Sequence, residues 1–326
     1  MTMSTDTLRV SPGVDPLQKP EGAQSIKWGS AIFIVTLHVL VFGGILCAVC
    51  GWTPWFFSWS ALISVPVGVV LFGWIGIGVC YHRLLTHKSF ETPRWFERLL
   101  TMLAFCNLEG SSVWWVSVHR RHHHHSDTRP DPHTPLVNFL WSHVGWLLFF
   151  NPAIEGSAVY ENTKDLQRDP FHVWMHKYNG WLLVWAAHVV IIFWIGFCIG
   201  LVDGDVLDGY QNGVNFIVWG VLVRTVFFWN ITWLVNSATH VWGYQNYKSG
   251  DEAGNVWWVA ILTGGEGWHN NHHHDQCCAT VQHKWWEFDP SYYAIRLFGL
   301  LGLVRRKTIK TRERKLKSAP AVREVT

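Results

Sequence analysis

Charged side chains are scarce in this chain of 326 residues. Asp, Glu, Lys and Arg make up 15% of it, and 49% is hydrophobic, whereas a soluble domain carries about a quarter charged residues. The formal net charge is only +3, and proteins that bind nucleic acid concentrate many more basic residues on one face. The composition therefore argues against a nucleic-acid partner and indicates a protein embedded in a lipid bilayer.

The cysteines lack the even spacing that would indicate a disulfide framework. The chain has seven cysteines, most of them in or beside apolar segments. Cys47 and Cys50 have the spacing of a redox motif, but they lie inside a hydrophobic stretch rather than near a βαβ pattern. We interpret the cysteines as buried thiols in a protein whose polar face lies in a reducing compartment.

A secretory signal is missing from the start of the chain. Residues 1–27 are polar and carry no short apolar core followed by a cleavage site. We expect them to form a flexible tail.

Long apolar runs are abundant instead. Four stretches reach the roughly 20 residues that a helix needs to cross a bilayer; they are residues 29–50, 54–80, 181–202 and 214–236. The connection 51–53 is short enough to predict a tight hairpin. The connection 203–213 contains three Asp and no Lys or Arg.

Basic residues gather at the other ends of these runs. Lys27, Arg83, Lys88, Arg94 and the stretch 305–317 lie there, and the positive-inside rule makes that side cytoplasmic, together with both termini. The run 54–80 is longer than a bilayer requires, and we expect its end to project into the cytosol.

Three further apolar stretches are predicted to lie along the membrane surface. Residues 99–118, 135–152 and 285–304 are interpreted as interfacial or re-entrant helices. The predicted fold is an all-α integral membrane protein with four transmembrane helices and a cytoplasmic helical cap. It comprises a tail (1–27), a membrane domain (28–304) and a basic tail (305–326).

Histidine is unusually frequent, with 19 copies. Nine of them form four clusters, in the motifs HRLLTH, HRRHH, NSATH and HNNHH, all on the predicted cytoplasmic side. The nine are His82, His87, His119, His122, His123, His240, His269, His272 and His273. Neutral imidazole is the commonest biological metal ligand, so these residues are the candidate ligands of a metal centre.

The spacing of the nine histidines predicts how they are used. Helix positions i, i+3 and i+4 share a face, so the three histidines of HRRHH and of HNNHH are each expected to point toward a common ion. His82 and His87 are five residues apart and could straddle one site or serve two neighbouring ions. Nine imidazoles exceed what one ion can bind. Two ions with four or five ligands each fit a dinuclear redox site better than a closed zinc site.

Two polar residues of the fourth run stand out beside the histidines. Asn236 precedes His240 by four residues, at the cytoplasmic end. Arg224 falls near the middle of the run, where an ionisable residue is costly. The sequence leaves open whether Arg224 forms a structural ion pair with a buried acid or has a functional role.

Several motifs give a resemblance to a known family. YHRLLTHKSF, HRRHHHHSDTRPDPH, SHVGW, WLVNSATHVWGY and GEGWHNNHHH occur in this order between about residues 28 and 304. In these motifs the chain resembles the membrane-bound fatty acyl desaturases, specifically the Δ9 stearoyl-CoA-type group. The resemblance implies a four-span, mushroom-like enzyme with a cytoplasmic diiron site.

The same resemblance implies the roles of the site residues and the reaction. The family's histidine boxes map onto eight of the histidines, its ninth ligand maps onto His240, and Asn236 matches an asparagine that reaches one iron through a water. Two electrons and O2 would remove two hydrogens from a saturated acyl chain and leave a cis double bond, expected at the Δ9 position. A long bent tunnel, lined by aromatics such as Trp114 and Trp115, is expected to hold one CH2–CH2 unit near the metal.

The chain departs from its animal relatives in two respects. Animal acyl-CoA desaturases carry an Arg-Asp pair immediately before the second histidine box, where this chain has Ser117 and Val118. The acyl chain could therefore be linked to CoA, to a carrier or to a lipid. No cytochrome b5 domain follows the third box, so a separate electron donor such as cytochrome b5, ferredoxin or rubredoxin is expected.

Two other functions fit parts of the pattern. Diiron membrane hydroxylases and carotenoid ketolases share histidine clusters, but NSATH and GEGWHNNHH match desaturases better. A histidine-rich metal transporter would place its ligands near the bilayer midplane, whereas these histidines lie at or beyond the cytoplasmic ends of the spans.

Overall fold

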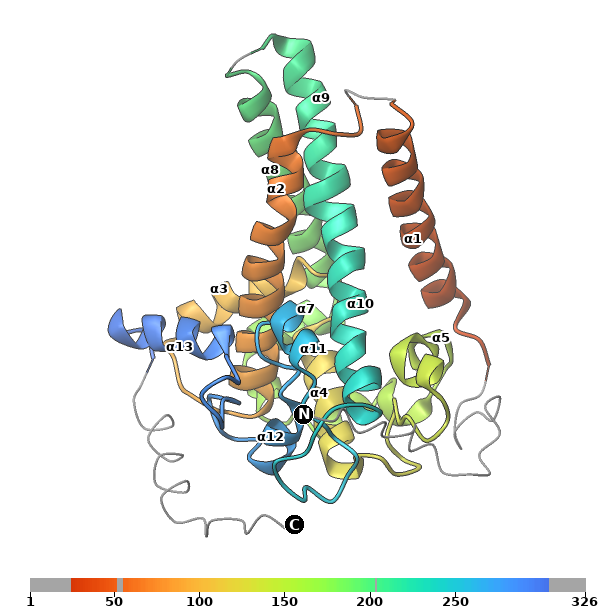
Figure 1. Cartoon of the computed structure of the whole chain (residues 1–326), viewed down its shortest axis with the longest axis vertical. Coiled ribbons are helices and arrows are strands. Elements are labelled where there is room, and N and C mark those ends of the chain that lie inside the picture. The colour runs from red at the N-terminus through yellow and green to blue at the C-terminus, as the bar shows by residue number, and fades with distance from the viewer. Residues whose placement is uncertain (1–24, 52–54, 203, 305–326) are drawn as a thin grey trace, which may run out of the picture.

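The computed structural model describes residues 25–51, 55–202 and 204–304. These residues form helices and a few isolated β-bridges, with no β-strand among them. Four helical segments are long and apolar enough to cross a membrane; they are Trp28–Val49, Trp59–Thr86, Gly180–Gly200 and Val206–His240. They form the upright part of the molecule, and the shorter helices gather around its lower end (Figure 1). The prediction of a helical protein with four membrane-spanning segments is confirmed.

Two of the spans consist of consecutive helical pieces without an intervening loop. The second span joins α2 (Trp59–Gly68) to the π-helical η1 (Val69–Thr86). The fourth joins α9 (Val206–Phe216), η5 (Ile217–Val223), α10 (Arg224–Ser237) and η6 (Ala238–His240). Both are longer than a bilayer requires and reach the lower end of the molecule, where they carry candidate ligands.

The fourth span begins earlier than its hydropathy predicts. Asp205 accepts hydrogen bonds from the backbone N–H groups of Leu207 and Asp208, and Asp208 accepts one from the N–H of Asp205, which is a reciprocal capping box. The helix therefore starts at Val206 instead of residue 214. Polar residues within this first part find partners: Asn212 donates to the carbonyl of Gly196 and accepts from Ser58.

The predicted interfacial stretch 99–118 is split into two helices. α3 (Arg94–Phe105) and α4 (Ser112–His125) are separated by residues 106–111, because Ser111 caps α4 by accepting from the N–H of Trp114. The remaining short helices are η2 (Trp141–Gly145), α5 (Trp146–Leu148), η3 (Pro152–Ile154), α6 (Ala158–Glu161), η4 (Leu166–Arg168), α7 (Pro170–Lys177), α11 (Trp257–Thr263), α12 (His269–His274) and α13 (Pro290–Leu300).

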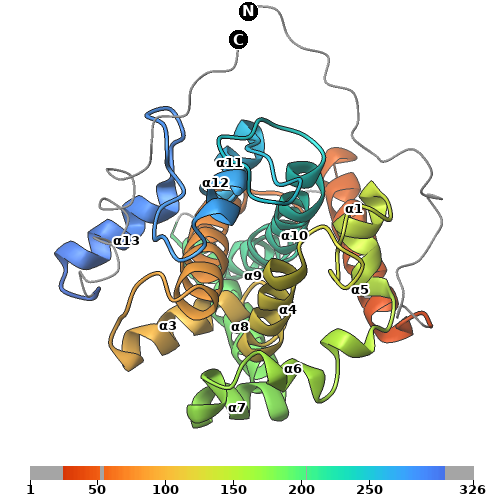
Figure 2. The ribbon, with the colours of Figure 1, turned by 90° about the horizontal axis from the view of Figure 1, so that it is seen from below.

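The densest core lies where the second span meets the cap helices. Tyr81 and Leu85 of η1 are fully buried against Phe105 of α3 and Val116 of α4. Higher along the spans, apolar side chains point outward, and Phe42 of α1 (Trp28–Val49) is 72% exposed. This gradient is expected for helices whose upper parts face lipid instead of protein. The cap thus packs against the lower end of the second span, around which α3, α4, α12 and α13 are arranged (Figure 2).

The first described residues are attached to the cap. The N–H of Lys27 donates to the carbonyl of Leu148, and the N–H of Phe150 donates to the carbonyl of Ser25. Residues 25–27 therefore pair with residues 148–150, although they belong to the predicted tail 1–27. The rest of that tail, and the predicted tail 305–326, lie outside the described residues.

Candidate metal centre

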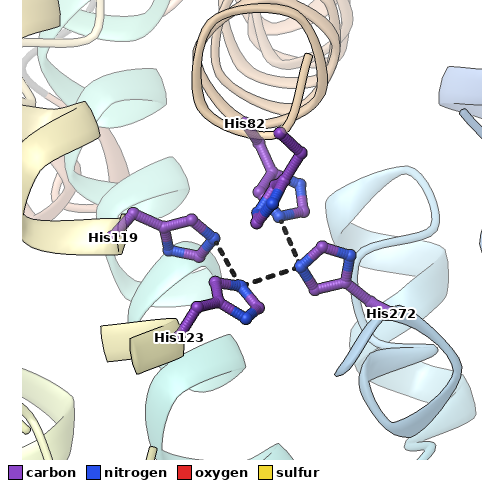
Figure 3. Close-up of side chains that lie close together, drawn as sticks. His82, His119, His123 and His272 are labelled. Carbon is purple, nitrogen blue, oxygen red and sulfur yellow. Dashed lines mark hydrogen bonds between the residues drawn. The ribbon is translucent and has the colours of Figure 1, made fainter. Parts of the chain in front are cut away.

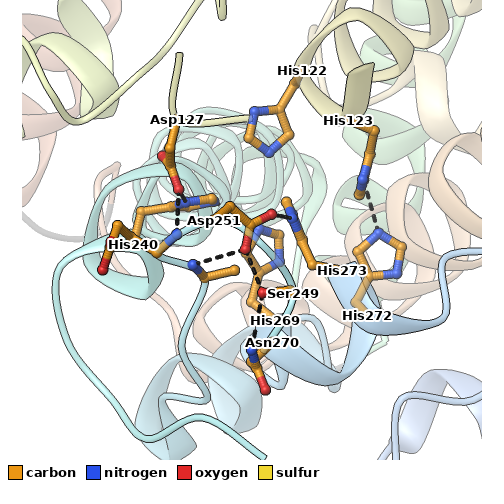
Figure 4. Close-up of polar contacts among 12 residues, drawn as sticks. His122, His123, Asp127, His240, Ser249, Asp251, His269, Asn270, His272 and His273 are labelled. Atoms are coloured by element: carbon orange, nitrogen blue, oxygen red, sulfur yellow. Dashed lines mark hydrogen bonds and ion pairs between the residues drawn. The ribbon is translucent and has the colours of Figure 1, made fainter. Parts of the chain in front are cut away.

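The nine histidines come together in two groups at the lower end of the molecule. In each group one ring nitrogen of every member lies within 4.8 Å of the others. We call the group His82, His87, His119, His123 and His272 the first cluster (Figure 3), and the group His122, His240, His269 and His273 the second cluster (Figure 4). The clusters hold five and four imidazoles, in agreement with the prediction of two ions with four or five ligands each.

The three histidines of each HxxHH motif do not share one ion, and that prediction is wrong. On α4, His119 and His123 belong to the first cluster and His122 to the second. The i and i+4 residues share a direction, but neighbouring helical residues point about 100° apart. On α12 the same split sends His272 to the first cluster, and His269 and His273 to the second. Each of the two helices therefore contributes histidines to both clusters.

His82 and His87 both join the first cluster. His82 lies in the last turns of η1, and His87 is the first residue after that helix. Their rings meet edge to face with centroids 4.8 Å apart. Of the two arrangements that the sequence left open, the structure has both residues serving a single site.

The ring nitrogens of the first cluster face one another at short range. His82 Nε2 lies 3.0 Å from His272 Nε2, which lies 2.9 Å from His123 Nε2, which in turn lies 3.1 Å from His119 Nε2 (Figure 3). A neutral imidazole has a single N–H, so these three contacts cannot all be hydrogen bonds. Some of the ring nitrogens therefore direct their lone pairs at each other. Converging lone pairs repel unless a cation lies between them, so this donor set suits a metal ion.

Carboxylates hold the outer nitrogens of the second cluster. Nδ1 of His122 donates to Asp131 over 3.0 Å, and Nδ1 of His240 donates to Asp127 over 3.0 Å. Nδ1 of His273 donates to Asp251 over 2.5 Å (Figure 4). With the proton fixed on Nδ1, each ring presents a bare Nε2 to the centre, as in the carboxylate–histidine–metal arrangement. Nε2 of His122 and of His273 are buried and have no hydrogen-bond partner within the described residues.

The first cluster has one comparable partner. Nδ1 of His82 lies 2.7 Å from Oε2 of Glu266. Glu266 is held in turn by Arg83, which donates from Nε and Nη2 to its other oxygen and from both Nη atoms to Asp289. All of these groups are buried, and the guanidinium balances the two carboxylates.

These carboxylates were not found from the sequence. Asp127 and Asp131 follow the second histidine motif directly in HHHHSDTRPDPH, and this adjacency was the one available signal. Asp251 and Glu266 lie in segments that only the folded chain brings to the histidines.

Burial and mutual repulsion keep most of the ligand rings neutral. Burial, followed by repulsion from neighbouring imidazoles, lowers the pKa of His87, His119, His123 and His272 well below its usual value. The pKa values of His122 and His269 are lowered for the same reasons. A histidine must be deprotonated to bind a metal, so these rings are in the binding form at neutral pH.

Three of the carboxylates, those of Asp127, Asp251 and Glu266, remain charged despite burial. Burial by itself raises the pKa of Asp127, but His240 lowers it below the usual value, and His273 does the same for Asp251. Arg83 and His82 outweigh burial at Glu266 and bring its pKa to about 2. The centre is therefore a set of mainly neutral imidazoles backed by the anions of Asp127, Asp251 and Glu266, which favours a bound cation.

Two further groups of possible ligands have structural roles. His133 and Asp131 lie beside His122, so they support the second cluster. Glu97, Asp169 and His172 also meet, but Asp169 accepts two hydrogen bonds from Arg98, so this group is an ion pair between α3 and the start of α7.

A cavity of about 410 Å³ leads to the first cluster. His119 lines it at the metal end, Asn236 also lines it, and Trp114 and Trp115 form part of its wall, as expected of the predicted tunnel. The ring of Trp115 stacks on that of His119 with centroids 5.0 Å apart. This volume falls in the range of small-molecule sites.

At its other end the cavity approaches the surface near α1 and α8 (Gly180–Gly200). Phe33 and Asn179 line it there and are exposed. Lys27 and Glu155 also line it and form an ion pair at 2.5 Å. All four lie near the lower ends of their elements, so the opening is at the level of the cap instead of the middle of the spans.

An acidic residue, Glu109, lies in the wall of this cavity. Glu109 accepts a hydrogen bond from Nε1 of Trp115 over 3.2 Å. The hydroxyl of Thr232 lies beside the carboxyl group of Glu109. Within the described residues, neither this hydroxyl nor Oε1 of Glu109 has a hydrogen-bond partner in regular geometry. Burial raises the pKa of Glu109 to about 8, and Trp115 offsets only part of this effect. The carboxyl group is therefore uncharged at neutral pH.

The fold and the site together define a helical membrane protein with a histidine-rich centre at the end of a cavity that is partly lined by aromatic side chains. Residues 57–296 match the family model described as fatty acid desaturase. The chain is similar to the sn-1 stearoyl-lipid 9-desaturase of Anabaena variabilis, with 39% identity over 281 residues, which cover 85% of this chain and 92% of that protein. It is also 39% identical to the sn-2 palmitoyl-lipid 9-desaturase of Nostoc sp. (strain 36) over 291 residues, 88% and 93% of the two chains.

A plant relative is similar over nearly the same region. The Acyl-CoA C20 Delta5-desaturase of Anemone leveillei is 34% identical over 277 residues, which cover 85% of this chain and 82% of that protein. The chain belongs to the fatty acid desaturase family. It is a membrane oxidoreductase that acts with O2 on fatty acyl chains.

Proposed function

We propose that this desaturase introduces a cis double bond at the Δ9 position of an acyl chain that is esterified in a membrane lipid, and that it uses two iron ions. The observation that carries the proposal is the cavity that ends at the first cluster. A saturated chain that enters from the cap-level opening would pass Trp114 and Trp115 and reach His119. The 9-desaturase names of the bacterial relatives support the position.

The residues of the two clusters fit iron. Imidazole nitrogens suit Fe, Cu, Zn and Ni, but a closed four-coordinate set is what structural zinc prefers. Five and four imidazoles, backed by carboxylates on their outer nitrogens, suit a redox pair with room for a further ligand. The bound iron would supply the oxidising power that an unactivated CH2–CH2 unit requires. Asn236, which lines the same cavity as His119, is proposed to reach one ion through a water.

The chain's own residues prepare the reaction. Trp115 and Val118 line the cavity next to His119 and keep water from the acyl chain. The saturated unit, O2, two electrons and two protons give the double bond and two waters. The electrons come from a separate small redox protein, such as cytochrome b5, ferredoxin or rubredoxin.

Several observations support a lipid-linked substrate over acyl-CoA. Ser117 and Val118 occupy the positions where animal acyl-CoA desaturases carry the Arg-Asp pair, which is expected to help hold the CoA group. Serine and valine side chains carry no charge, so neither residue can pair with a CoA phosphate. In addition, Ser117 is buried and Val118 lines the cavity. Two of the most similar relatives have names that specify acyl lipids. The cavity opening beside the end of α1, where Trp28 is 66% exposed, suits entry from the bilayer surface.

The orientation follows from the charges at the span ends. Lys27, Arg83 and Lys88 lie at the end that carries both histidine clusters, and the positive-inside rule makes this end cytoplasmic. We propose that the centre and both termini face the cytosol, where the reduced electron donor is available.

The substrate assignment is tested in membranes of a desaturase-deficient host that expresses the chain. Radiolabelled stearoyl-lipid and radiolabelled stearoyl-CoA are supplied separately, with lipid acyltransferases inhibited, and the products are located by gas chromatography and mass spectrometry. We expect a Δ9 double bond in the lipid-bound label only. Desaturation of the CoA-bound label alone would reject the lipid substrate, and hydroxylated products without a double bond would reject desaturation.

A further inference from the structure

Arg224 is buried in the fourth span without a carboxylate partner. Its side chain is 0% exposed. Nε donates to the carbonyl of Gly220 over 3.1 Å, both terminal nitrogens donate to the carbonyl of Cys106 over 3.1 Å, and Nη1 also donates to Oδ1 of Asn107 over 2.5 Å. Among the described residues no carboxylate bonds to it, so the hypothesis of an ion pair with a buried acid does not describe this arginine.

Neutral dipoles compensate the guanidinium charge instead. Cys106 is the C-cap of α3, and the carbonyl end of a helix carries partial negative charge. The ring of Phe72 adds a cation–π contact, with the guanidinium carbon 4.7 Å from its centroid. The second span leaves room for the arginine at Gly68, where a Cβ would lie 3.1 Å from Cγ of Arg224. Arg224 is therefore built to hold the end of α3.

The segment that follows α3 needs such a hold. Leu108 has a φ of 56° and Gly110 a φ of 90°, and a bulky residue with positive φ is strained and persists only where its surroundings fix it. Asn107 provides most of the fixation: its side-chain amide donates to the carbonyl of Phe72, and its own carbonyl accepts from Nε1 of Trp229 over 2.7 Å.

This segment is also part of the substrate cavity. Residues 108–111 all line the cavity, and so does Trp229. Arg224 and Asn107 lie behind this wall and do not line it themselves. A displacement of residues 106–107 would therefore move the cavity wall relative to His119 without removing a metal ligand.

We propose that Arg224 and Asn107 form a clamp that fixes the cavity wall 108–111 and thereby determines which carbons of the acyl chain lie at the metal centre. Arg224 is a positioning residue in this scheme. The proposal rests on the proposed function, because it assigns part of the specificity of that same cavity.

The test compares products of the full-length wild type with those of Arg224→Leu, Arg224→Lys and Asn107→Ala in a desaturase-deficient host. Double-bond positions and chain lengths are measured by mass spectrometry, and metal content is measured on the purified proteins. We expect the ratio of the main positional isomer to all others to fall about fivefold or more in Arg224→Leu and Asn107→Ala, with unchanged metal content. Lys can still donate to the Cys106 carbonyl, so Arg224→Lys should restore part of the selectivity.

Two controls separate the clamp from a general loss of structure. Arg98→Gln removes another arginine of the α3 region, one that pairs with Asp169, and should give the wild-type isomer ratio. The double variant Arg224→Leu/Asn107→Ala should be no less selective than the worse single variant, because residues that act as one unit have non-additive effects.

The outcomes distinguish the clamp from the function on which it rests. A wild type that forms no double bond would reject the proposed function. A wild type that desaturates, with variants that keep its isomer ratio at whatever rate remains, would reject the clamp. If Arg224→Leu does not accumulate in the membrane, the isomer ratio of Asn107→Ala decides.

Discussion

At the scale of single residues, the acidic partners of the ligand histidines determine how the imidazoles present themselves. Asp127, Asp131 and Asp251 each accept from an Nδ1 and so leave the Nε2 atoms of the second cluster free. Such partners fix ring orientation and raise ligand basicity, and their loss costs roughly 10- to 100-fold in metal affinity.

Asp131→Asn is therefore expected to weaken metal retention without removing any ligand. The amide cannot supply the negative charge that supports His122, so metal should be lost at roughly 10- to 100-fold lower chelator concentration than from the wild type. A chelator titration followed by metal analysis measures this. Asp208→Asn alters a carboxylate of the α9 cap at the other end of the molecule and should titrate like the wild type. Equal retention in the two variants would show that Asp131 does not support the centre.

Glu109 gives the cavity a pH dependence. Its pKa is raised from 4.5 to about 8 in the folded chain, so the folded state holds a proton that the unfolded state has already lost between these values. Stability from this group therefore falls as the pH rises from 4.5 toward about 8. Above that range a carboxylate charge appears in the cavity wall.

The carboxylate charge that appears at alkaline pH is expected to lower activity, because it lies in the wall of the substrate cavity. Glu109→Gln should remove this loss of activity because the amide stays neutral. We expect the ratio of desaturation at about pH 9 to that at about pH 7 to be several-fold higher in the variant than in the wild type. Initial rates in isolated membranes across the pH range measure it, and Glu155→Gln at the cavity opening serves as the control. The same pH profile in wild type and Glu109→Gln would contradict an ionisation in the cavity wall.

At the scale of the elements, glycines allow the second span to approach its neighbours closely. A Cβ on Gly76 would lie 2.7 Å from the backbone nitrogen of Ala104 in α3, and one on Gly73 would lie 2.2 Å from the ring of Phe228 in α10. Backbone cannot move aside as a side chain can, so the contact at Gly76 is the stricter of the two.

Gly76→Ala is expected to destabilise the protein by about 1–3 kcal/mol, the usual cost of overpacking. The midpoint of thermal unfolding in detergent, followed by tryptophan fluorescence, should fall. Gly43→Ala is the matched control, because a Cβ on Gly43 of α1 meets nothing within 4 Å. Equal midpoints for both variants would mean that α3 does not pack on the second span as described.

The same elements show what could be predicted from sequence. The four spans follow from apolar runs of sufficient length, and the nine candidate ligands follow from their clustering. The split of HRRHH between two clusters could not be predicted, because it depends on where α12 and His240 lie relative to α4. The early start of the fourth span could not be predicted, because polar residues such as Asn212 are typical of a loop. In the folded chain Asn212 is hydrogen-bonded to Ser58 and to the carbonyl of Gly196, so it is accommodated within a helix.

At the scale of the whole molecule, the chain divides into an upright part of long helices, which are the apolar spans, and a cap of shorter helices at its lower end (Figure 1). The second and fourth spans connect the two parts, since His82 and His240 lie near their lower ends. The candidate centre is thus attached to the membrane helices, and the cavity extends from it toward the lower end of α1.

The proposed orientation predicts which cysteines a membrane-impermeant maleimide can reach. Cys277 is exposed close to α12, whereas Cys50 is exposed at the opposite end of α1. In a variant that retains only Cys277, labelling should occur in inverted vesicles and not in intact cells, and a variant with only Cys50 should not share this pattern. Labelling of Cys277 from outside intact cells would place the centre on the non-cytoplasmic side.

The central claim is that nine histidines hold two iron ions, and metal analysis of the purified protein tests it most directly. Inductively coupled plasma mass spectrometry on the detergent-purified wild type should find two irons per chain, because the histidines form two clusters. His272→Ala and His269→Ala remove one ligand from the first and the second cluster, and each should lower the iron content. One iron per chain, or stoichiometric zinc in its place, would contradict the account.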